Sequence, residues 1–134
     1  MLYGEEHVRR YIETDGQEGH DWQPGVPTLL LTTTGRKSGR RHVTPLIYQT
    51  DGDAVLVVAS KGGAISPPEW FRNLEADPDV EVQIWGEKFP ARARVATPEE
   101  KPAMWEKMTK VWPAYDEYQL KTDREIPVVV LDRA

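Results

Sequence analysis

The run Val26-Pro27-Thr28-Leu29-Leu30-Leu31-Thr32-Thr33-Thr34 is the segment from which the fold of this chain is predicted. It is apolar, rich in β-branched residues and without helical spacing, which is typical of a buried strand. Gly35 ends it. After the basic loop that follows, residues 42–50 are expected to form a second strand, and the turn pair Asp51-Gly52 predicts a hairpin into a third strand over residues 54–59. These three strands are expected to be antiparallel neighbours.

The rest of the chain adds a second hairpin, a last strand and short helices. Strands are predicted over residues 80–85, 89–96 and 126–131, and helices over residues 5–14, from Ser66 to Asp77, from Thr97 to Pro113 and over about 114–121. Two of these helices begin with capping-box patterns, SPPE at 66–69 and TPEE at 97–100. Residues 16–27 have no period and are predicted to be an ordered loop. Six strands with inserted helices indicate a mainly β protein, an antiparallel barrel or sandwich rather than a doubly wound parallel sheet.

Composition and length predict one domain over residues 1–134, with an N-terminal helix and loop over about 5–25. A chain of 134 residues that is 39% apolar buries enough surface to fold unaided. No apolar run approaches the ~20 residues that span a bilayer, and the N-terminus lacks the regions of a signal peptide. We therefore expect a cytoplasmic protein without an integral membrane segment. Because cysteine is absent, redox chemistry would require a bound cofactor.

Charge is distributed unevenly along the chain. The formal net charge of −5 argues against a general nucleic-acid binder. Residues 22–50 nevertheless contain no aspartate or glutamate, while Arg36, Lys37, Arg40 and Arg41 fall within six positions. An acidic protein with one basic, acid-free segment is expected to use it on a small anion rather than on nucleic acid. On charge alone, a solvated basic turn is the alternative.

The basic loop carries residue types that bind oxyanions. Gly35 and Gly39 let backbone N–H groups approach a phosphate, Ser38 can donate a hydrogen bond, and guanidinium groups pair with phosphate or carboxylate in a bidentate manner. A hairpin turn whose charges keep a sheet edge soluble is the competing interpretation. A second glycine-rich strand end, residues 59–63, adds another hydroxyl and cation; it either faces the first loop across a barrel mouth or is a plain flexible loop.

Aromatic residues recur at helical spacing toward the C-terminus. Trp112, Tyr115 and Tyr118 are three residues apart and would form a stripe on one helical surface. Such stripes usually belong to the core, although tyrosine hydroxyls that line a pocket can donate hydrogen bonds to a substrate carbonyl or nitro oxygen. Trp70 and Asn73 lie on consecutive turns of the helix predicted after Ser66, where packing and capping are their ordinary roles.

Missing motifs exclude several other classes. The three histidines have no metal-ligand spacing, so no metal is assigned. The chain has neither a dinucleotide-binding glycine fingerprint nor a P-loop, and nothing singles out a hydrolase triad or a glycosidase carboxylate pair. The functional prediction therefore depends on the two glycine-rich loops and the aromatic stripe.

Four segments, taken together, resemble a known family. They are LLTTTGRKSG at 30–39, ASKGGA at 59–64, WFRNL at 70–74 and TDREIPV at 122–128. Their order and spacing resemble the deazaflavin-dependent nitroreductase family of actinobacteria, the A-type flavin/deazaflavin oxidoreductases, and residues 14–22 resemble one branch of it. The resemblance implies a six-stranded antiparallel split β-barrel with short helices. It also implies coenzyme F420 as the cofactor and hydride transfer from its reduced form, F420H2, to an electron-poor quinone, unsaturated lactone or enone, or nitro compound.

The resemblance implies roles for individual residues. The phosphate and carboxylate tail of the coenzyme would be held by Arg36, Lys37, Ser38, Gly39 and His42, and its ring or linker would be flanked by Pro45, Ala59, Ser60, Lys61, Trp70 and Asn73. The acceptor pocket would be formed by Ile47, Trp112, Tyr115 and Tyr118. Ser60, Tyr115 and Tyr118 would act in catalysis, because their hydroxyls can meet negative charge that develops on the acceptor.

Two positions depart from the nitroimidazole-reducing members of that family. His42 and Ile47 stand where those members carry arginine and tyrosine, so nitroimidazole reduction is not implied. The long amphipathic N-terminal extension of some members is also absent, which leaves a peripheral membrane contact open but unsupported. The alternatives to an F420H2-dependent reductase are an FMN-binding split-barrel reductase and a non-catalytic F420 carrier. Either a monomer or a homodimer is compatible with the sequence.

Overall fold

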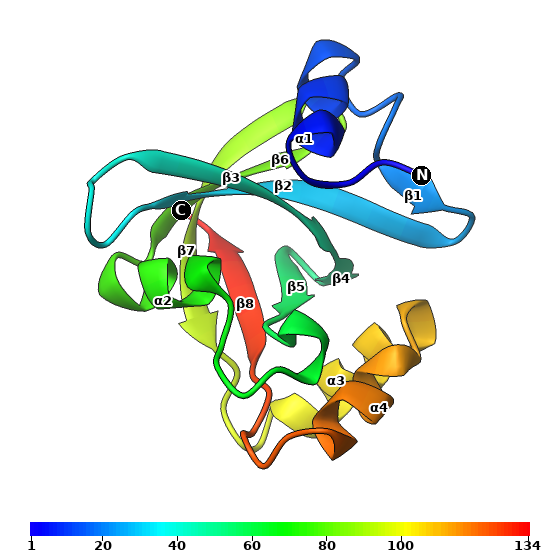
Figure 1. The fold of residues 1–134 in the computed structure, drawn as a ribbon, viewed down its shortest axis with the longest axis vertical. Helices are drawn as coiled ribbons and strands as arrows, with labels where there is room; N and C mark the ends of the chain where they lie inside the picture. Colours follow the sequence, from blue (N-terminus) through cyan, green and yellow to red (C-terminus); the bar gives the residue numbers. More distant parts are fainter.

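The computed structural model describes residues 1–134 as one curled antiparallel sheet with helices at its two ends (Figure 1). The strands are β1 (Asp21–Gln23), β2 (Val26–Thr34), β3 (Arg41–Ile47), β4 (Gln49–Asp51), β5 (Ala54–Val58), β6 (Asp79–Ile84), β7 (Glu87–Val95) and β8 (Val128–Arg133). The helices are α1 (Gly4–Glu13), α2 (Glu69–Ala76), α3 (Lys101–Val111), α4 (Ala114–Leu120) and the 3-10 turn η1 (Lys61–Gly63). The strand order is β1-β2-β6-β7-β8-β5-β4, with β3 paired to β2. The arrangement is a split β-barrel, which confirms the predicted fold class.

The structure has eight strands where six were predicted. One addition is β1, a three-residue strand inside the segment expected to be a loop. The other arises because the strand predicted over 42–50 divides at Tyr48 into β3, which pairs with β2, and β4, which pairs with β5. Tyr48 is buried at this corner, and its hydroxyl lies 2.8 Å from His20 Nε2. A change of partner strand is a tertiary event, so local periodicity does not reveal it.

The two predicted capping boxes had different outcomes. Before α3, the Glu100 N–H donates to Thr97 Oγ1 (3.2 Å) and the Thr97 N–H donates to Glu100 Oε1 (3.0 Å), as the pattern predicts. The start predicted at Ser66 is wrong, because α2 begins at Glu69 and Ser66 makes no cap. Pro68 disfavours helical geometry in Pro67 and is itself extended, so the helix begins only after both prolines. The predicted end near Asp77 is confirmed.

The last strand begins two residues later than predicted. The N–H of Ile126 donates to Gln119 Oε1 at 2.8 Å rather than to a neighbouring strand, and Pro127 has no N–H to donate. Regular pairing therefore starts at Val128, opposite Val58. None of the helices combines the length and the apolar character required to cross a bilayer.

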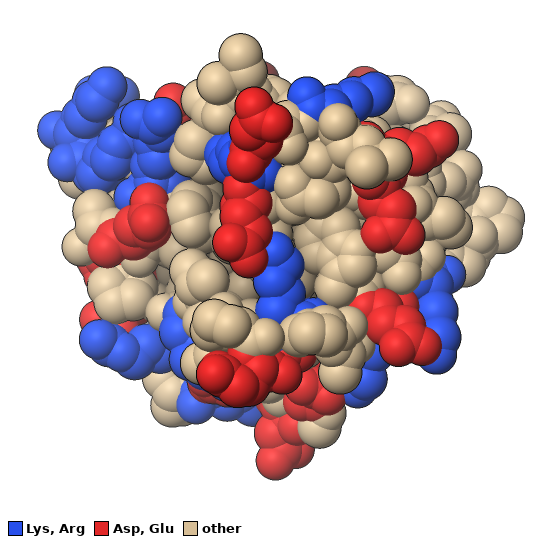
Figure 2. All heavy atoms as spheres, turned by 90° about the horizontal axis from the view of Figure 1, so that it is seen from below, with Lys and Arg blue, Asp and Glu red and all other residues tan.

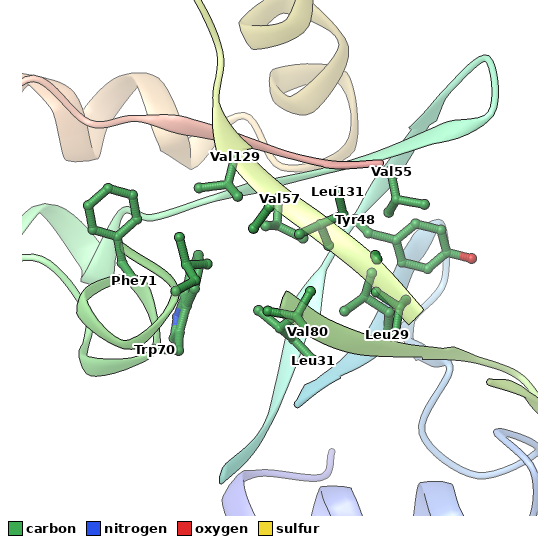
Figure 3. Packing of buried hydrophobic residues seen from close by; sticks show 14 of the residues in the cluster. Leu29, Leu31, Tyr48, Val55, Val57, Trp70, Phe71, Val80, Val129 and Leu131 are labelled. Carbon is green, nitrogen blue, oxygen red and sulfur yellow. The ribbon is translucent and has the colours of Figure 1, made fainter. Parts of the chain in front are cut away.

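Two hydrophobic clusters lie on opposite faces of β5 and β8. Val55, Val57, Val129 and Leu131 point into the barrel, where Trp70 and Phe71 of α2 lie at one end of the cluster (Figure 3). Leu56, Val58, Val128 and Val130 pack against α3 and α4. These strands read as continuous apolar runs because both of their faces are buried. The packing holds α2 and α4, which carry most of the predicted aromatic site residues, against the same pair of strands.

Candidate functional site

Two cavities adjoin and share Trp70 in their walls. The first encloses about 430 Å³ and is lined mainly by apolar and aromatic residues. The second encloses about 570 Å³ and is lined mainly by polar and charged residues. Both volumes are in the range of small-molecule sites. An apolar cavity beside a cationic one has the shape and chemistry to accept a flat ring joined to an anionic chain.

The β2–β3 hairpin and α2 build the cationic cavity. Its lining residues are Gly35, Arg36, Lys37, Ser38, Arg41, His42, Val43 and Thr44 from the hairpin, Glu69, Trp70 and Asn73 from α2, and Glu5 from α1. Lysine and arginine gather at the left of Figure 2, the side toward which the tip of this hairpin projects in Figure 1. The basic segment, which was predicted to bind a small anion, thus contributes Arg36, Lys37 and Arg41 to the lining of this cavity.

Close packing around Gly35 shapes the floor of this cavity. A Cβ at Gly35 would lie 2.7 Å from His42 Nε2 and 2.9 Å from Ser38 Oγ, so only glycine leaves room for both side chains. The Gly35 N–H donates to the Arg40 carbonyl at 2.7 Å, and the Gly39 N–H donates to the Gly35 carbonyl at 2.8 Å. The turn is therefore ordered by its own backbone and presents Ser38 and His42 together.

Arg36 already has partners within the protein. Its Nη1 lies 2.7 Å from Glu69 Oε2 and donates to Asn73 Oδ1 at 3.0 Å. Asn73 is buried and donates from Nδ2 to Thr33 Oγ1 at 3.4 Å. The hydrogen bond from Arg36 lowers the pKa of Glu69, which keeps that carboxylate ionised. Arg36 thus braces the hairpin against α2.

The other three cations of the loop form no ion pair. Lys37 and Arg41 line the cationic cavity, whereas Arg40 is exposed and does not line it. Arg41 donates from Nη1 to Thr34 Oγ1 at 3.2 Å. Lys37 and Arg41 are therefore the two cations of this cavity that have no ion-pair partner.

The aromatic stripe lies in the wall of the apolar cavity. The cavity is lined by Leu2, Tyr3, Gly4, His7, Trp22, Thr28, Pro45, Leu46, Ile47, Val58, Ser60, Lys61, Gly62, Pro68, Trp70, Trp112, Tyr115 and Tyr118. The Tyr115 and Tyr118 rings are 6.1 Å apart, and Trp112 donates from Nε1 to the Tyr118 hydroxyl at 3.3 Å. Tyr115 is only 5% exposed, and burial raises its pKa, so it remains a neutral phenol at physiological pH. The stripe contributes to a core and to a cavity wall at once.

Ser60 has a hydroxyl available to a ligand. The residue is 8% exposed and lines the apolar cavity, and the hydrogen bonds that it accepts from Arg124 and from the Gly63 N–H both use its carbonyl. Ser60 Oγ therefore faces the cavity without a protein partner. A hydroxyl that is accessible from the cavity and has no protein partner can donate to a carbonyl oxygen of a bound molecule.

Most of the predicted site residues line one of the two cavities, but two do not. Ala59 belongs to the hydrophobic core, and Gly39 is at the exposed tip of the hairpin. Sequence reasoning also missed residues that line the cavities, above all Trp22, His7 and the segment Leu2–Gly4. The Trp22 ring lies 5.5 Å from Trp112, and its Nε1 donates to the Leu2 carbonyl at 2.8 Å. The one sequence signal for Trp22 was its place in the stretch 14–22.

The fold and the two adjoining cavities place the chain among the split β-barrel oxidoreductases. More narrowly, the chain belongs to the F420H(2)-dependent quinone reductase family, whose sequence model matches residues 3–133. This membership confirms the predicted family, with coenzyme F420 as its cofactor and an oxidoreductase as its activity.

Individual relatives agree with this assignment. The F420H(2)-dependent quinone reductase of Mycobacterium tuberculosis (strain ATCC 25618 / H37Rv) is 41% identical over 130 residues, which cover 95% of this chain and 87% of that protein. The solved structure of an F420-H2 dependent reductase, FDR-A, superposes with a TM-score of 0.74 at 40% identity, over 79% of this chain and 94% of that one. A domain-swapped dimer matches with the same TM-score and identity, over 79% of this chain and 80% of that one.

Proposed function

We propose that residues 1–134 act as a single coenzyme-binding domain that reduces a quinone with F420H2. The observation that carries the proposal is the shared wall at Trp70, where an aromatic cavity meets a cationic one. Family membership supports the coenzyme, and the name of the family supports a quinone as the acceptor. The quinone would gain a hydride and would take a proton from solvent, which balances the proton that oxidation of the coenzyme releases to solvent.

The residues of the cationic cavity fit the anionic tail of the coenzyme. Lys37 and Arg41 supply unpaired charge, Ser38 and His42 supply further polar contacts, and Arg36 acts through its contacts with α2. The neighbouring cavity is lined by Pro45, Ser60, Lys61 and Trp70, which would flank the ring. Asn73 lines the cationic cavity and accepts a hydrogen bond from Arg36. Gly39 and Ala59 would serve through backbone geometry rather than by contact. Coenzyme F420, when bound, supplies the hydride.

The acceptor would occupy the part of the apolar cavity bounded by Ile47, Trp112, Tyr115 and Tyr118. Catalysis here is mainly positioning, because a hydride moves when the reacting atoms are held ~3 to 3.5 Å apart. The hydroxyls of Ser60 and Tyr118 would donate to the acceptor oxygen as it gains negative charge. Tyr115 stays protonated and can serve only as a hydrogen-bond donor or a packing residue.

Cofactor choice is tested first, by titrating the purified protein with F420 and with FMN and following quenching of fluorescence. Binding of F420 with weaker or absent binding of FMN is expected. Binding of FMN alone would overturn the proposal in favour of an FMN-dependent reductase.

Turnover is tested by mixing the protein with F420H2 and a short-chain benzoquinone, and following the reappearance of oxidised F420. Enones and nitroaromatic compounds form the comparison set. Faster oxidation with the quinone than without it is the expected result. A protein that binds F420 but accelerates none of these reactions would be a coenzyme carrier instead.

Assembly belongs to the same proposal. A solved relative at 40% identity is a domain-swapped dimer, which supports a homodimer over a monomer for this chain. Light scattering coupled to gel filtration measures the mass directly. A mass near 15.3 kDa, that of one chain, would exclude the dimer.

A further inference from the structure

The turn between β5 and α2 has an unusual backbone at the place where it enters the apolar cavity. Lys61, Gly62 and Gly63 have consecutive positive φ angles of 46°, 63° and 84°. Glycine adopts this region freely, but lysine does not, and a strained residue persists only where its surroundings hold it. Ser60 and Lys61 are the side chains that this turn presents to the cavity. The contacts that hold the turn therefore also set the position of Ser60.

Arg124 holds the turn from behind. Its Nη1 donates to the Ala59 carbonyl (3.1 Å), its Nη2 to the Ser60 carbonyl (2.9 Å) and its Nε to the Ala64 carbonyl (3.2 Å). Arg124 does not line the apolar cavity and forms no ion pair with a carboxylate. The guanidinium thus donates to three carbonyls of one turn. Its planar group holds these donors in a fixed geometry that the single ammonium of lysine cannot reproduce.

The opposite side of the turn rests on α4. A Cβ at Gly63 would lie 2.6 Å from the Tyr118 carbonyl and 3.1 Å from Lys121 Cβ, so the turn packs against that helix without space for a side chain. The turn is therefore fixed between Arg124 and the helix that carries Tyr118. Its position therefore sets where Ser60 lies relative to α4, which carries Tyr118 of the same cavity wall.

Arg124 is itself tied to α4 through Gln119. Gln119 donates from Nε2 to the Arg124 carbonyl at 2.8 Å and accepts from the Ile126 N–H at 2.8 Å. The Arg124 N–H donates to Thr122 Oγ1 at 3.1 Å. The guanidinium therefore projects from a backbone that is hydrogen-bonded to α4, so that contacts link the turn, Arg124 and α4 to one another.

We infer that Arg124 is a positioning residue for the reaction, which acts by fixing the turn 59–64 and with it the Ser60 hydroxyl. The inference deepens the proposed function and rests on it. It requires that loss of Arg124 lowers turnover more than it lowers coenzyme affinity, because the cationic cavity, which would hold the tail of the coenzyme, is built from other elements. Burial lowers the pKa of Arg124, which agrees with a cation that has no carboxylate partner.

The test compares wild type with Arg124→Ala and Arg124→Lys, and uses Arg92→Gln as the matched control. Arg92 is an exposed arginine whose ion pair with Asp79 lies on the sheet away from both cavities. For Arg124→Ala we expect kcat with F420H2 and a short-chain benzoquinone to fall between about 10- and 100-fold, as for a misplaced reacting group. Arg124→Lys should lie between Arg124→Ala and wild type, and Arg92→Gln should match wild type. Added guanidinium at low millimolar concentration should restore part of the activity of Arg124→Ala.

A second measurement is independent of turnover. The Gly63 and Ala64 amides donate to the Ser60 and Lys61 carbonyls, so their hydrogen exchange reports the order of the turn. Exchange of these amides should accelerate in Arg124→Ala and, more weakly, in Arg124→Lys, while exchange of the Gly39 amide in the β2–β3 hairpin stays unchanged. Arg124→Lys is the variant to use if Arg124→Ala does not fold.

The outcomes separate this inference from the proposed function. Wild type that binds F420 but reduces no acceptor would refute the proposed function. The exchange data would still test whether Arg124 fixes the turn 59–64. Active wild type with equal kcat and equal Gly63 exchange in both variants would overturn the inference. So would a loss confined to coenzyme affinity, because that result would place Arg124 in binding rather than in positioning.

Discussion

At the residue scale, the four cations of the β2–β3 hairpin have unequal surroundings. Arg36 is paired with Glu69 and Asn73, and Arg40 points away from the cavity, whereas Lys37 and Arg41 line it without a carboxylate partner. A cation that already has an anionic partner contributes less binding free energy to a second anion, because part of its charge is compensated. Coenzyme affinity should therefore depend chiefly on Lys37 and Arg41.

The double variant Lys37→Ala/Arg41→Ala should weaken F420 binding by about tenfold or more, since a charge-assisted hydrogen bond contributes ~1.5 to 3 kcal/mol. Arg40→Ala removes one positive charge from the same loop but outside the cavity, and serves as the control for each of the two charges removed in the double variant. Fluorescence titration at two salt concentrations measures both, and the loss should shrink at high salt because the contact is electrostatic. A loss of binding free energy in Arg40→Ala that is half of the loss in the double variant, or more, would indicate a general charge effect instead.

Trp22 lines the apolar cavity and contacts both the N-terminal segment and Trp112. The centroid of its ring lies 5.5 Å from that of Trp112 and 5.8 Å from that of Tyr3. Its indole N–H donates a hydrogen bond to the Leu2 carbonyl. Trp22→Ala should raise the KM for a quinone between about two- and tenfold, the range of an aromatic pair worth ~0.5 to 1.5 kcal/mol. Trp22→Phe keeps a ring and should lose less. Steady-state kinetics checks both, and an unchanged KM would remove Trp22 from the acceptor site.

At the element scale, the start of α3 is tied to the sheet by ionic groups. Glu100 accepts from Arg94 Nη1 at 2.7 Å and from the Thr97 N–H at 3.0 Å, while Arg94 Nε donates to Asp132 of β8 at 2.9 Å. The capping box thus does more than begin a helix, since it connects α3 to β7 and β8. These bonds, with Arg94 as the main cause, lower the pKa of Glu100 from 4.5 to about 2.

This shift predicts how stability changes with pH. A carboxylate with a lowered folded-state pKa stabilises the protein at pH values above its unfolded pKa, and that contribution is lost as pH falls through the folded value. The contribution of Glu100 should therefore be complete above about pH 4.5 and disappear toward pH 2. Urea unfolding of wild type and Glu100→Gln across this window measures it, and the difference between them should vanish at the acid end. A constant difference would show that Glu100 acts without its charge.

At the scale of the whole molecule, the proposed ligand sites draw on nearly every part of the chain. The cationic cavity combines the β2–β3 hairpin, α2 and α1, and the apolar cavity combines the N-terminal segment, β1, β3, η1 and α4. In Figure 1, α1 and α4 lie at opposite ends of the molecule. A ligand that fills both cavities therefore contacts elements from both ends of the molecule at once.

Coenzyme binding should consequently stabilise the entire fold. F420 at 100 times its dissociation constant adds about 2.7 kcal/mol, which corresponds to a rise in Tm of roughly 10 °C for a domain of this size. FMN at the same concentration should raise Tm less. Thermal unfolding followed by circular dichroism measures both shifts. A larger shift with FMN than with F420 would contradict the proposed cofactor.

The sequence by itself determined the fold class, the family and the chemistry of the main loops. The apolar run at 26–34 and the hairpin turns predicted an antiparallel barrel or sandwich. The resemblance of the motifs at 30–39, 59–64, 70–74 and 122–128 to a known family implied the split barrel and an F420-dependent oxidoreductase. These features are local, because strand propensity, turn chemistry and charge are properties of neighbouring residues.

Only the tertiary structure decided which partners those residues meet. It divided one predicted strand at Tyr48, paired Arg36 with Glu69 while leaving Lys37 and Arg41 free, brought Trp22 to Trp112, and set Arg124 behind Ser60. Each of these contacts joins residues distant in the chain or depends on which strand lies alongside, and such pairings are fixed by packing of the whole sheet. The basic loop and the aromatic stripe could thus be recognised from the sequence. The contacts that give individual residues of these segments different roles could not.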